Sequence, residues 1–335
     1  MNKTLTIIIP TYNMEKYLNK CLSSLILSDD IIRFLDVLIV NDGSKDQSSD
    51  IAHSYQKKYP GVFRVIDKDN GNYGSCVNVG LREAKGKYIK ILDADDSFDT
   101  SHFGEFVLFL NNTDVDVVFN DMCQECENGE VIKQVSFNLP SGIFPLSEVV
   151  KNSGRMWMHC VTYKTHNLRD FGYVQTEGIS YTDQEWVFLP LALSKSAAYF
   201  NKLIYRYLVG REGQTINPQV WNKNFWQELK GLRVMYDEYT KYSSHFDAYQ
   251  QQYLKNRLID RTTVCYKAYL LTFDNNDNYQ LMVDFDRELK TLAPNIYSRM
   301  DDLHYTGYHY VKAWRKKYSK NLFFLKLLKK LRGYS

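Results

Sequence analysis

Short apolar segments alternate with helical patterns over the first hundred residues of this 335-residue chain. Residues 5–9, 34–40, 62–66 and 88–92 are rich in β-branched and other apolar side chains, and the stretches between them place apolar side chains at helical spacing. Such alternation is typical of α/β proteins, in which helices cover both faces of a mostly parallel sheet. We therefore predict a Rossmann-like α/β fold for this part of the chain.

The pattern changes in the rest of the chain. Residues 115–119 and 131–137 favour short strands, an irregular stretch rich in aromatic side chains follows, and the chain is mainly helical after Trp221. Because about 150 residues is a common domain size, the length suits two domains. We predict an α/β domain over residues 1–215 and a mainly helical C-terminal region over residues 216–335.

Polar side chains follow three of the predicted strands. Tyr12 and Asn13 come after the first strand, Asp42 after the second, and Asp93 and Asp95 after the fourth. In a parallel sheet the carboxyl ends of the strands share one edge, and ligands bind there. The three loops therefore predict a single binding site at this edge.

The acidic stretch at residues 93–96 offers the chemistry of a metal site. Asp93 and Asp95 are two residues apart at a strand end, so both carboxylates can lie on one side and hold a hard divalent cation, Mn²⁺ or Mg²⁺, together with a diphosphate. An acidic turn without a ligand is the alternative, and for this motif alone it is the better interpretation.

Three further loops suit a nucleotide. Tyr12 could stack on a base, and Asp42 could accept hydrogen bonds from a base edge or a ribose; a core aromatic and an Asx-turn are the alternatives. Residues 70–75 place glycines just before a helix, where backbone can approach an anion. The GK[ST] ending of a nucleoside-triphosphatase loop and the glycine spacing of a dehydrogenase are both absent from this sequence, which argues against those two classes.

Three motifs together resemble the family 2 glycosyltransferases with the GT-A fold, of the kind involved in bacterial surface polysaccharide synthesis. They span residues 6–13, 40–44 and 78–96, and the resemblance is close over residues 5–100 and looser to about residue 215. It implies a GT-A-like α/β domain. Within that domain, the resemblance implies a nucleotide-sugar half over about residues 1–120 and an acceptor half over about residues 120–215.

The resemblance also implies roles for individual residues. Asp95 would ligate the metal, and Asp93 would contact either the ribose or the metal. Asn78 would support the nucleotide pocket. The nucleotide-binding set implied in this way is Pro10, Thr11, Tyr12, Asp42, Asn78, Asp93 and Ala94.

Two later segments complete the implied site. Residues 181–186 resemble the family's second acidic motif, which makes Asp183 the general base, with Glu185 as the competing carboxylate because Thr182 departs from the family pattern. The segment that closes over the pyrophosphate is implied at residues 204–215, with the candidates Arg211, Gln214 and Thr215. His159 and His166 lie on the acceptor side and are left out of the catalytic set.

These expectations give one reaction. A sugar from a nucleotide-diphosphate donor, a UDP-sugar by default, would pass with inversion to a hydroxyl of a glycan or lipid-linked oligosaccharide acceptor. Two other functions stay open: a nucleotidyltransferase, and a catalytically inactive protein that binds a sugar nucleotide or glycan. The net charge of +3 argues against a nucleic-acid partner.

The sequence also bears on location. We expect a cytoplasmic protein, because the apolar run at residues 5–10 is too short for a signal sequence and the six cysteines are irregularly spaced. Nine lysines and arginines crowd residues 312–332 among leucines and phenylalanines. This basic amphipathic segment would either lie on an anionic membrane, at the inner face of the cell membrane, or dock on its own domain.

Overall fold

The computed structural model describes residues 2–152, 156–211, 214, 217–273 and 277–319. The chain divides into two compact units, Met1–Glu212 and Gly213–Ser335. Each unit is described by itself below.

A large mixed sheet forms the centre of the first unit, with the strand order β3-β2-β1-β4-β9-β6-β10-β5. Its first four strands run parallel, as the sequence predicted, and nearly all residues of β1, β2 and β4 are buried. They are β1 (Lys3–Thr11), β2 (Leu35–Asn41), β3 (Phe63–Asp67) and β4 (Gly86–Ile91).

The second half of the sheet is mixed. Strand β9 (Val161–Lys164) runs antiparallel between β4 and β6 (Val117–Glu125), and β6 runs parallel to the long strand β10 (Ser196–Leu208). Three short strands pair antiparallel at its margins. They are β5 (Ser97–Phe98) on β10, β7 (Val131–Val135) on β6 and β8 (Gly142–Pro145) on β10.

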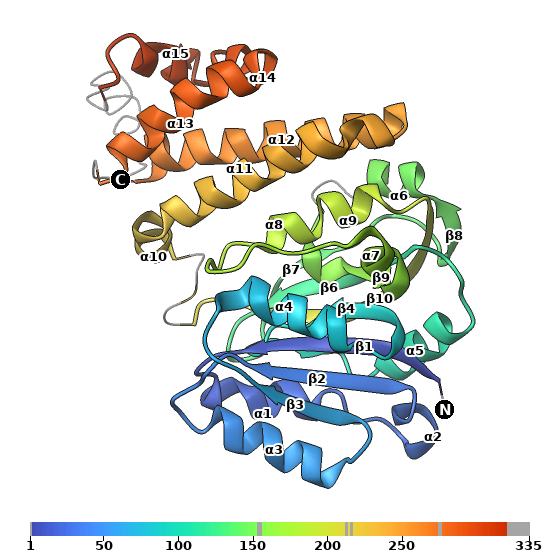
Figure 1. Ribbon diagram of the computed structural model, residues 1–335. Helices are drawn as coiled ribbons and strands as arrows, with labels where there is room; N and C mark the ends of the chain where they lie inside the picture. The colour runs from blue at the N-terminus through green and yellow to red at the C-terminus, as the bar shows by residue number, and fades with distance from the viewer. Residues whose placement is uncertain (1, 153–155, 212–213, 215–216, 274–276, 320–335) are drawn as a thin grey trace. The chain divides into compact units, whose positions relative to one another are not determined.

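Helices lie on both faces of the parallel strands, so the predicted α/β class is confirmed. In Figure 1, α1 (Glu15–Ser23) and α3 (Ser48–Lys58) lie on one side of β1 to β3, and α4 (Asn72–Glu83) lies on the other. The remaining helices of this unit are α2 (Asp29–Ile32), α5 (Phe103–Asn111), α6 (Leu146–Asn152), the 3₁₀ turn η1 (Met158–Cys160), α7 (Thr165–Phe171), α8 (Asp183–Trp186) and α9 (Leu189–Ala192).

The second unit is mainly helical, as predicted. Its two longest helices are α11 (Phe225–Tyr242) and α12 (Ala248–Lys267), and α12 begins with a capping box between Asp247 and Gln250. The other elements are α10 (Pro218–Lys223), η2 (Ser243–His245), the π-helical turn η3 (Ala268–Thr272), α13 (Tyr279–Leu292), α14 (Pro294–Met300), the β11–β12 hairpin (His304–Tyr305 and Tyr308–His309) and α15 (Tyr310–Arg315).

The start of the basic C-terminal segment belongs to the core of this unit. Val311 and Trp314 on α15 are fully buried, and the Arg315 guanidinium donates to the buried Asp286 carboxylate at 2.8 Å. Lys312 stays exposed. Residues 320–335 of the predicted amphipathic segment lie outside the described residues.

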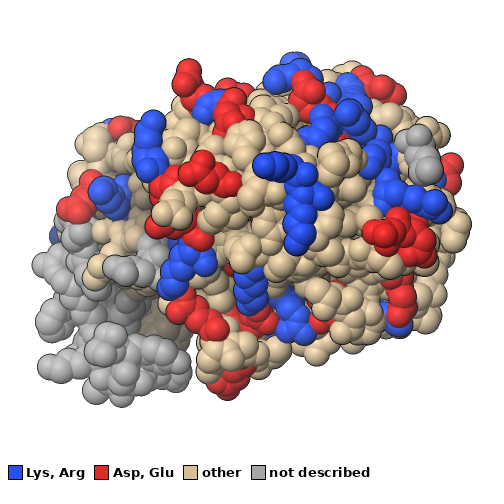
Figure 2. All heavy atoms as spheres, turned by 90° about the horizontal axis from the view of Figure 1, so that it is seen from below, with Lys and Arg blue, Asp and Glu red and all other residues tan. Residues whose placement is uncertain are grey.

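Surface charge is mixed where it can be seen. Figure 2 shows lysines and arginines interspersed with aspartates and glutamates over one face of the molecule. Among the described residues, no helix combines the length and the apolar character that crossing a membrane requires.

Candidate functional site

The strand-end loops meet at one edge of the sheet. Thr11 at the end of β1 lies beside Asn41 at the end of β2 in the parallel register, and the Asp42 amide donates to the Thr11 carbonyl at 2.8 Å. On the other side of β1, the Leu92 amide after β4 donates to the Ile8 carbonyl at 2.9 Å. The parallel pairing therefore brings the Tyr12, Asp42 and Asp93 loops together, as their positions in the sequence predicted.

The carboxylate of Asp42 is buried and holds the loop that follows β3. It accepts hydrogen bonds from Lys68 Nζ at 2.6 Å, the Gly71 amide at 2.9 Å and the Asn72 amide at 2.9 Å. Three protein donors thus share a carboxylate that has about four acceptor positions. Asp42 is also a hydrogen-bond neighbour of Cys76 and is only 3% exposed, so in this structure it serves to hold the loop.

Residues 10–12 present different faces to this edge. Pro10 and Thr11 are buried, and the Thr11 hydroxyl donates to the Ile9 carbonyl at 3.1 Å. Tyr12 is 46% exposed. Among these three candidates, only the Tyr12 ring is available for stacking on a base.

Asn78 joins α4 to the segment before α8. Its amide nitrogen donates to the Gln175 carbonyl and to Glu177 Oε1, both at 2.9 Å, and its amide oxygen accepts from the Gln175 amide at 2.8 Å. Gly74 has a related role, because a Cβ there would lie 1.9 Å from the Thr176 carbonyl oxygen. Asn78 and Gly74 support the site by packing two segments together.

The three aspartates after β4 have three different partners. Asp95 forms an ion pair with Arg211. Asp93 accepts from the Tyr73 hydroxyl at 2.5 Å. Asp96 is buried. It accepts hydrogen bonds from the Tyr205 hydroxyl and from the Leu208 amide, both at 2.7 Å, and so ties this loop to β10.

Negative charge accumulates in this loop. Burial raises the pKa of Asp95, and the nearby Asp93 carboxylate raises it further while Arg211 lowers it. Burial raises the pKa of Asp96 well above its usual range, and the charges of Asp95 and Asp93 add to this effect. Carboxylates crowded in this way disfavour one another's ionised form, so the loop is suited to a bound cation.

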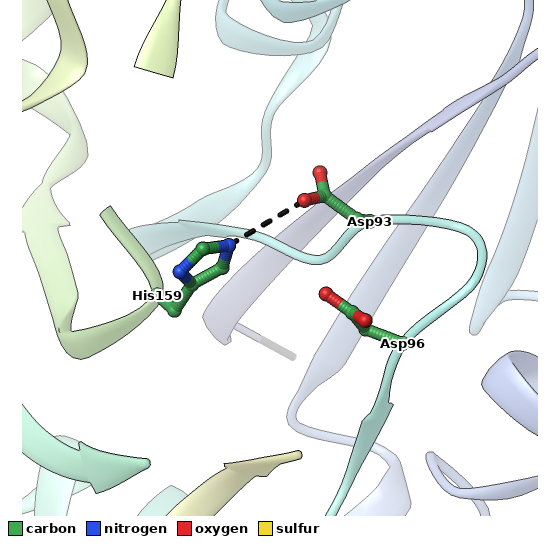
Figure 3. A group of neighbouring side chains, drawn as sticks. All are labelled: Asp93, Asp96 and His159. Carbon is green, nitrogen blue, oxygen red and sulfur yellow. Dashed lines mark ion pairs between the residues drawn. The ribbon is translucent and has the colours of Figure 1, made fainter. Parts of the chain in front are cut away.

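His159 is a member of this cluster that the sequence reasoning left out. Its Nε2 atom lies 3.5 Å from Asp93 Oδ2, and ligand atoms of Asp93, Asp96 and His159 all lie within 4.8 Å of one another (Figure 3). The His159 ring lies 4.6 Å from the Tyr205 ring and 4.8 Å from the Tyr207 ring, between centroids. A single histidine among aromatic residues gives no signal for this placement, whereas His166 is exposed on α7.

The donor set suits a divalent cation. The ligand atoms that lie close together belong to Asp93, Asp96 and His159, and Asp95 is instead paired with Arg211. Carboxylate oxygens are the ligands that Mg²⁺ and Mn²⁺ prefer, and His159 adds an imidazole. Among the described residues, the buried Nδ1 atom of His159 has no hydrogen-bond partner. Asp96 is less available, because its two oxygens already accept hydrogen bonds from β10.

Asp183 lies near this acidic loop at the first turn of α8. Burial and the Asp93 carboxylate raise the pKa of the Tyr73 hydroxyl most, and the charge of Asp183 raises it further. Burial and the residue 93–96 carboxylates raise the pKa of the Tyr207 hydroxyl, and Asp183 adds a smaller effect. Glu185, the competing carboxylate, is 2% exposed and accepts from the Thr176 amide at 2.8 Å. Glu185 therefore holds the preceding loop in place, and Asp183 is the better placed of the two for acid–base chemistry.

Of the three pyrophosphate candidates, the structure places Arg211 at the acidic loop. Its guanidinium pairs with Asp95 and lies 5.7 Å from the centroid of the Tyr17 ring. Gln214 belongs to the second unit, and Thr215 lies outside the described residues.

Comparisons of sequence agree with this arrangement. Residues 6–139 match the model of the family described as glycosyl transferase family 2. A glycosyltransferase of Mycoplasma pneumoniae is 44% identical over 100 residues, which cover 29% of this chain and 33% of that relative. The matches span between 32% and 36% of the length of the first three curated relatives.

One relative is also similar in structure. TarS of Staphylococcus aureus, a poly(ribitol-phosphate) beta-N-acetylglucosaminyltransferase, is 26% identical over 233 residues, covering 68% of this chain and 40% of TarS. The crystal structure of TarS 1-349 in complex with UDP-GlcNAc has a TM-score of 0.68 and 20% identity, covering 98% of this chain and 92% of that one.

A second solved structure is more distant. The mannosyltransferase PcManGT from Pyrobaculum calidifontis, in complex with GDP-Man and Mn²⁺, has a TM-score of 0.50 and 14% identity, covering 100% of this chain and 89% of that one. At such identities the structural likeness shows the fold, and the predicted GT-A-like fold is confirmed. The resemblance found in the sequence is confirmed as well, because residues 6–139, which hold its three motifs, match the model of glycosyl transferase family 2.

Proposed function

We propose that this chain is a metal-dependent, inverting glycosyltransferase that uses a nucleotide-diphosphate sugar. The observation that carries the proposal is the meeting of the Tyr12, Asp42 and Asp93–Asp96 loops at one sheet edge, with Asp183 close to the same carboxylates. This edge combines an aromatic ring, a hydrogen-bond acceptor, a cation site and a candidate base. Transfer from a nucleotide-diphosphate sugar would use all four. The ring and the hydrogen-bond acceptor would bind the nucleobase, the cation would bind the diphosphate, and the general base would act on the acceptor hydroxyl.

UDP is the proposed nucleotide. The Tyr12 ring would stack on the base, and Asp42 would accept an imide N–H in place of one of its present donors. The TarS structure with UDP-GlcNAc supports a UDP-sugar, because its fold covers nearly the whole of this chain. Asp93 and Asp95 would hold Mn²⁺ or Mg²⁺, which neutralises charge on the departing diphosphate.

Asp183 is the proposed general base. Its carboxylate would remove the proton from an acceptor hydroxyl as that oxygen attacks the anomeric carbon from the face opposite the diphosphate. The new glycosidic bond forms as the bond to the diphosphate breaks, so the anomeric centre inverts. A positioned base contributes about 10²–10⁴-fold to such a step.

The acceptor is proposed to be a hydroxyl-rich surface polymer or its lipid-linked precursor. The poly(ribitol-phosphate) in the name of TarS supports a polymer of this kind. A lipid-linked acceptor would place the enzyme at the inner face of the cell membrane, which the basic residues after Ser319 could help it reach. Co-sedimentation with anionic vesicles tests this point. A chain ending at Ser319 is the right comparison, because a shorter one would lose the buried Trp314 and Arg315.

A product assay tests the proposed reaction. The protein is incubated with UDP-sugars and Mn²⁺, with and without a polyol acceptor, and the released nucleotide is identified. We expect UDP, either from transfer or from slow donor hydrolysis. Release of pyrophosphate would instead identify a nucleotidyltransferase, and nucleotide-sugar binding without any turnover over the panel would identify an inactive binding protein.

A further inference from the structure

Two residues with separate roles in the proposed site touch each other. The Asp95 carboxylate, a proposed metal ligand, is paired with the Arg211 guanidinium, a proposed diphosphate ligand. They are 116 positions apart in the sequence, and their side chains are 10% and 16% exposed. The pair is therefore largely removed from water, where a charge–charge contact is worth more than on an open surface.

The local chain geometry directs Arg211 to this position. Strand β10 ends at Leu208, and Gly210 then adopts a φ of +89°, a conformation that L side chains rarely take. The Tyr17 ring on α1 provides a face beside the guanidinium at 5.7 Å, and the Tyr17 hydroxyl donates to Glu127 at 2.8 Å, which fixes the ring. Arg211 is therefore held at Asp95 by a turn and an aromatic face.

The Arg211 guanidinium offsets excess negative charge in the loop of residues 93–96. A buried carboxylate next to another carboxylate is costly to keep ionised, and Asp93 imposes this cost on Asp95. The Arg211 guanidinium offsets it. A divalent cation at Asp95 would offset the same charge.

We propose that Arg211 competes with the divalent cation for Asp95 and moves to the diphosphate when the metal–nucleotide complex binds. The proposal rests on the proposed function. The guanidinium fork matches phosphate oxygens, so a diphosphate beside Asp95 gives Arg211 a new partner when the metal takes its first one. The metal then binds weakly to the free protein and more tightly with UDP, which is a coupling between two ligands.

Direct metal binding tests the competition without any catalytic turnover. Mn²⁺ is titrated into the full chain in the absence of nucleotide, and UDP is titrated in the presence of saturating Mn²⁺, both by calorimetry. We expect Arg211→Met to tighten Mn²⁺ binding about tenfold and to weaken UDP binding about tenfold, within the usual range of coupling between two ligands. A merely structural role for Arg211 would weaken both.

Two further variants make the result specific. Arg82→Met removes another arginine of the same unit, one that lies 3.7 Å from Glu83 on α4, and it should change neither affinity. Tyr17→Leu keeps the Arg211 side chain but removes the aromatic face that helps to hold it at Asp95. Mn²⁺ binding should therefore tighten by a smaller factor than in Arg211→Met. This variant provides the test if Arg211→Met does not fold.

The outcomes separate this inference from the proposed function. Opposite changes in Mn²⁺ and UDP affinity support the competition. If Arg211→Met binds Mn²⁺ no more tightly than the wild type, the competition is wrong while metal-dependent UDP binding can stand. If the wild type binds no Mn²⁺ even with UDP present, the metal-dependent function itself is wrong.

Discussion

Buried acidic side chains occur in both units, but their charge is balanced in different ways. In the second unit, Asp286 is fully buried and accepts from Arg315 Nε at 2.8 Å, from the Tyr318 hydroxyl at 3.0 Å and from the Tyr266 hydroxyl. Each oxygen of this carboxylate meets a donor from a neighbouring element. The cluster fastens α15 and the residues after it to α12 and α13.

The cluster in the first unit has a surplus of negative charge. Asp93, Asp95 and Asp96 lie within four residues, and the first two raise the pKa of the third. Arg211 opposes the effect at Asp95. Burial alone therefore does not mark a functional carboxylate. The balanced cluster around Asp286, whose charge is matched by Arg315, stabilises the fold. The crowded cluster of Asp93, Asp95 and Asp96 has more negative charge than its protein partners offset, and it can bind a cation.

The largest expected effect concerns the carboxylate beside the crowded cluster. Asp183→Asn keeps the shape of the side chain but removes its basicity, so transfer should fall by about 10²–10⁴-fold while UDP binding is retained. Rates of UDP release and a UDP titration measure the two quantities. Glu185→Gln is the matched control, because Glu185 holds a loop amide. Near wild-type transfer by Asp183→Asn together with an inactive Glu185→Gln would reverse the assignment.

The next effect concerns the balanced cluster. Arg315→Met leaves the buried Asp286 without its cation, so the free energy of unfolding should fall by about 3–5 kcal/mol. Urea unfolding of the full chain measures this change. Arg287→Met, which removes a nearby arginine that packs on the Tyr318 ring at 5.5 Å, should cost far less. Equal losses for the two variants would mean that Asp286 does not depend on Arg315.

Lys90 is a buried cation in the first unit, and it should make the free energy of unfolding depend on pH. Its ammonium donates to Asn120 Oδ1, the His159 carbonyl and the Val161 carbonyl at 2.8–3.2 Å, and burial lowers its pKa from 10.5 to about 7. Between these pH values the unfolded chain binds a proton that the folded chain does not, so the contribution of Lys90 to stability rises with pH.

Lys90→Met isolates this contribution. From pH 7 to pH 9, the free energy of unfolding of the wild type should rise relative to that of Lys90→Met, by up to about 2 kcal/mol. Urea unfolding at a series of pH values measures the difference. A constant difference would show that the ammonium stays protonated in the folded protein.

The smallest effect has the opposite sign to that of Arg315→Met. Asp93→Asn relieves the crowding of carboxylates and can still accept from the Tyr73 hydroxyl, so the metal-free protein should gain about 1 kcal/mol of stability. The same variant should lose Mn²⁺ binding. Thermal unfolding with and without Mn²⁺ checks both points. A clear loss of stability without metal would show that the charge of Asp93 is already offset by its protein partners, as that of Asp286 is.

The strand-end loops could be predicted because local pattern determines them. Alternating strands and helices define the parallel sheet, and its parallel pairing brings Asp42 and Asp95 to one edge. The contact between Asp95 and Arg211 could not be predicted, since it spans 116 positions and depends on the path of β10. His159 was missed for a similar reason, because its position beside Asp93 depends on the antiparallel placement of β9 between β4 and β6.

Side-chain partners were also beyond the sequence pattern. The motif position of Asp42 suggested direct contact with a nucleotide, and that of Asn78 suggested support of the pocket. The structure shows three donors on Asp42, and it shows the nitrogen and the oxygen of the Asn78 side-chain amide bound to residues 175–177. A motif records which residue type is needed at a place. It does not tell whether that side chain meets the ligand or the loop that meets the ligand.

Metal-dependent binding of UDP tests most directly whether the crowded cluster is a cation and diphosphate site. UDP is titrated into the wild type and Asp95→Ala by calorimetry, with Mn²⁺ and with chelator, after circular dichroism has shown that both are folded. We predict that Mn²⁺ tightens UDP binding by the wild type and has no effect on Asp95→Ala. Equal tightening in both proteins would contradict the account.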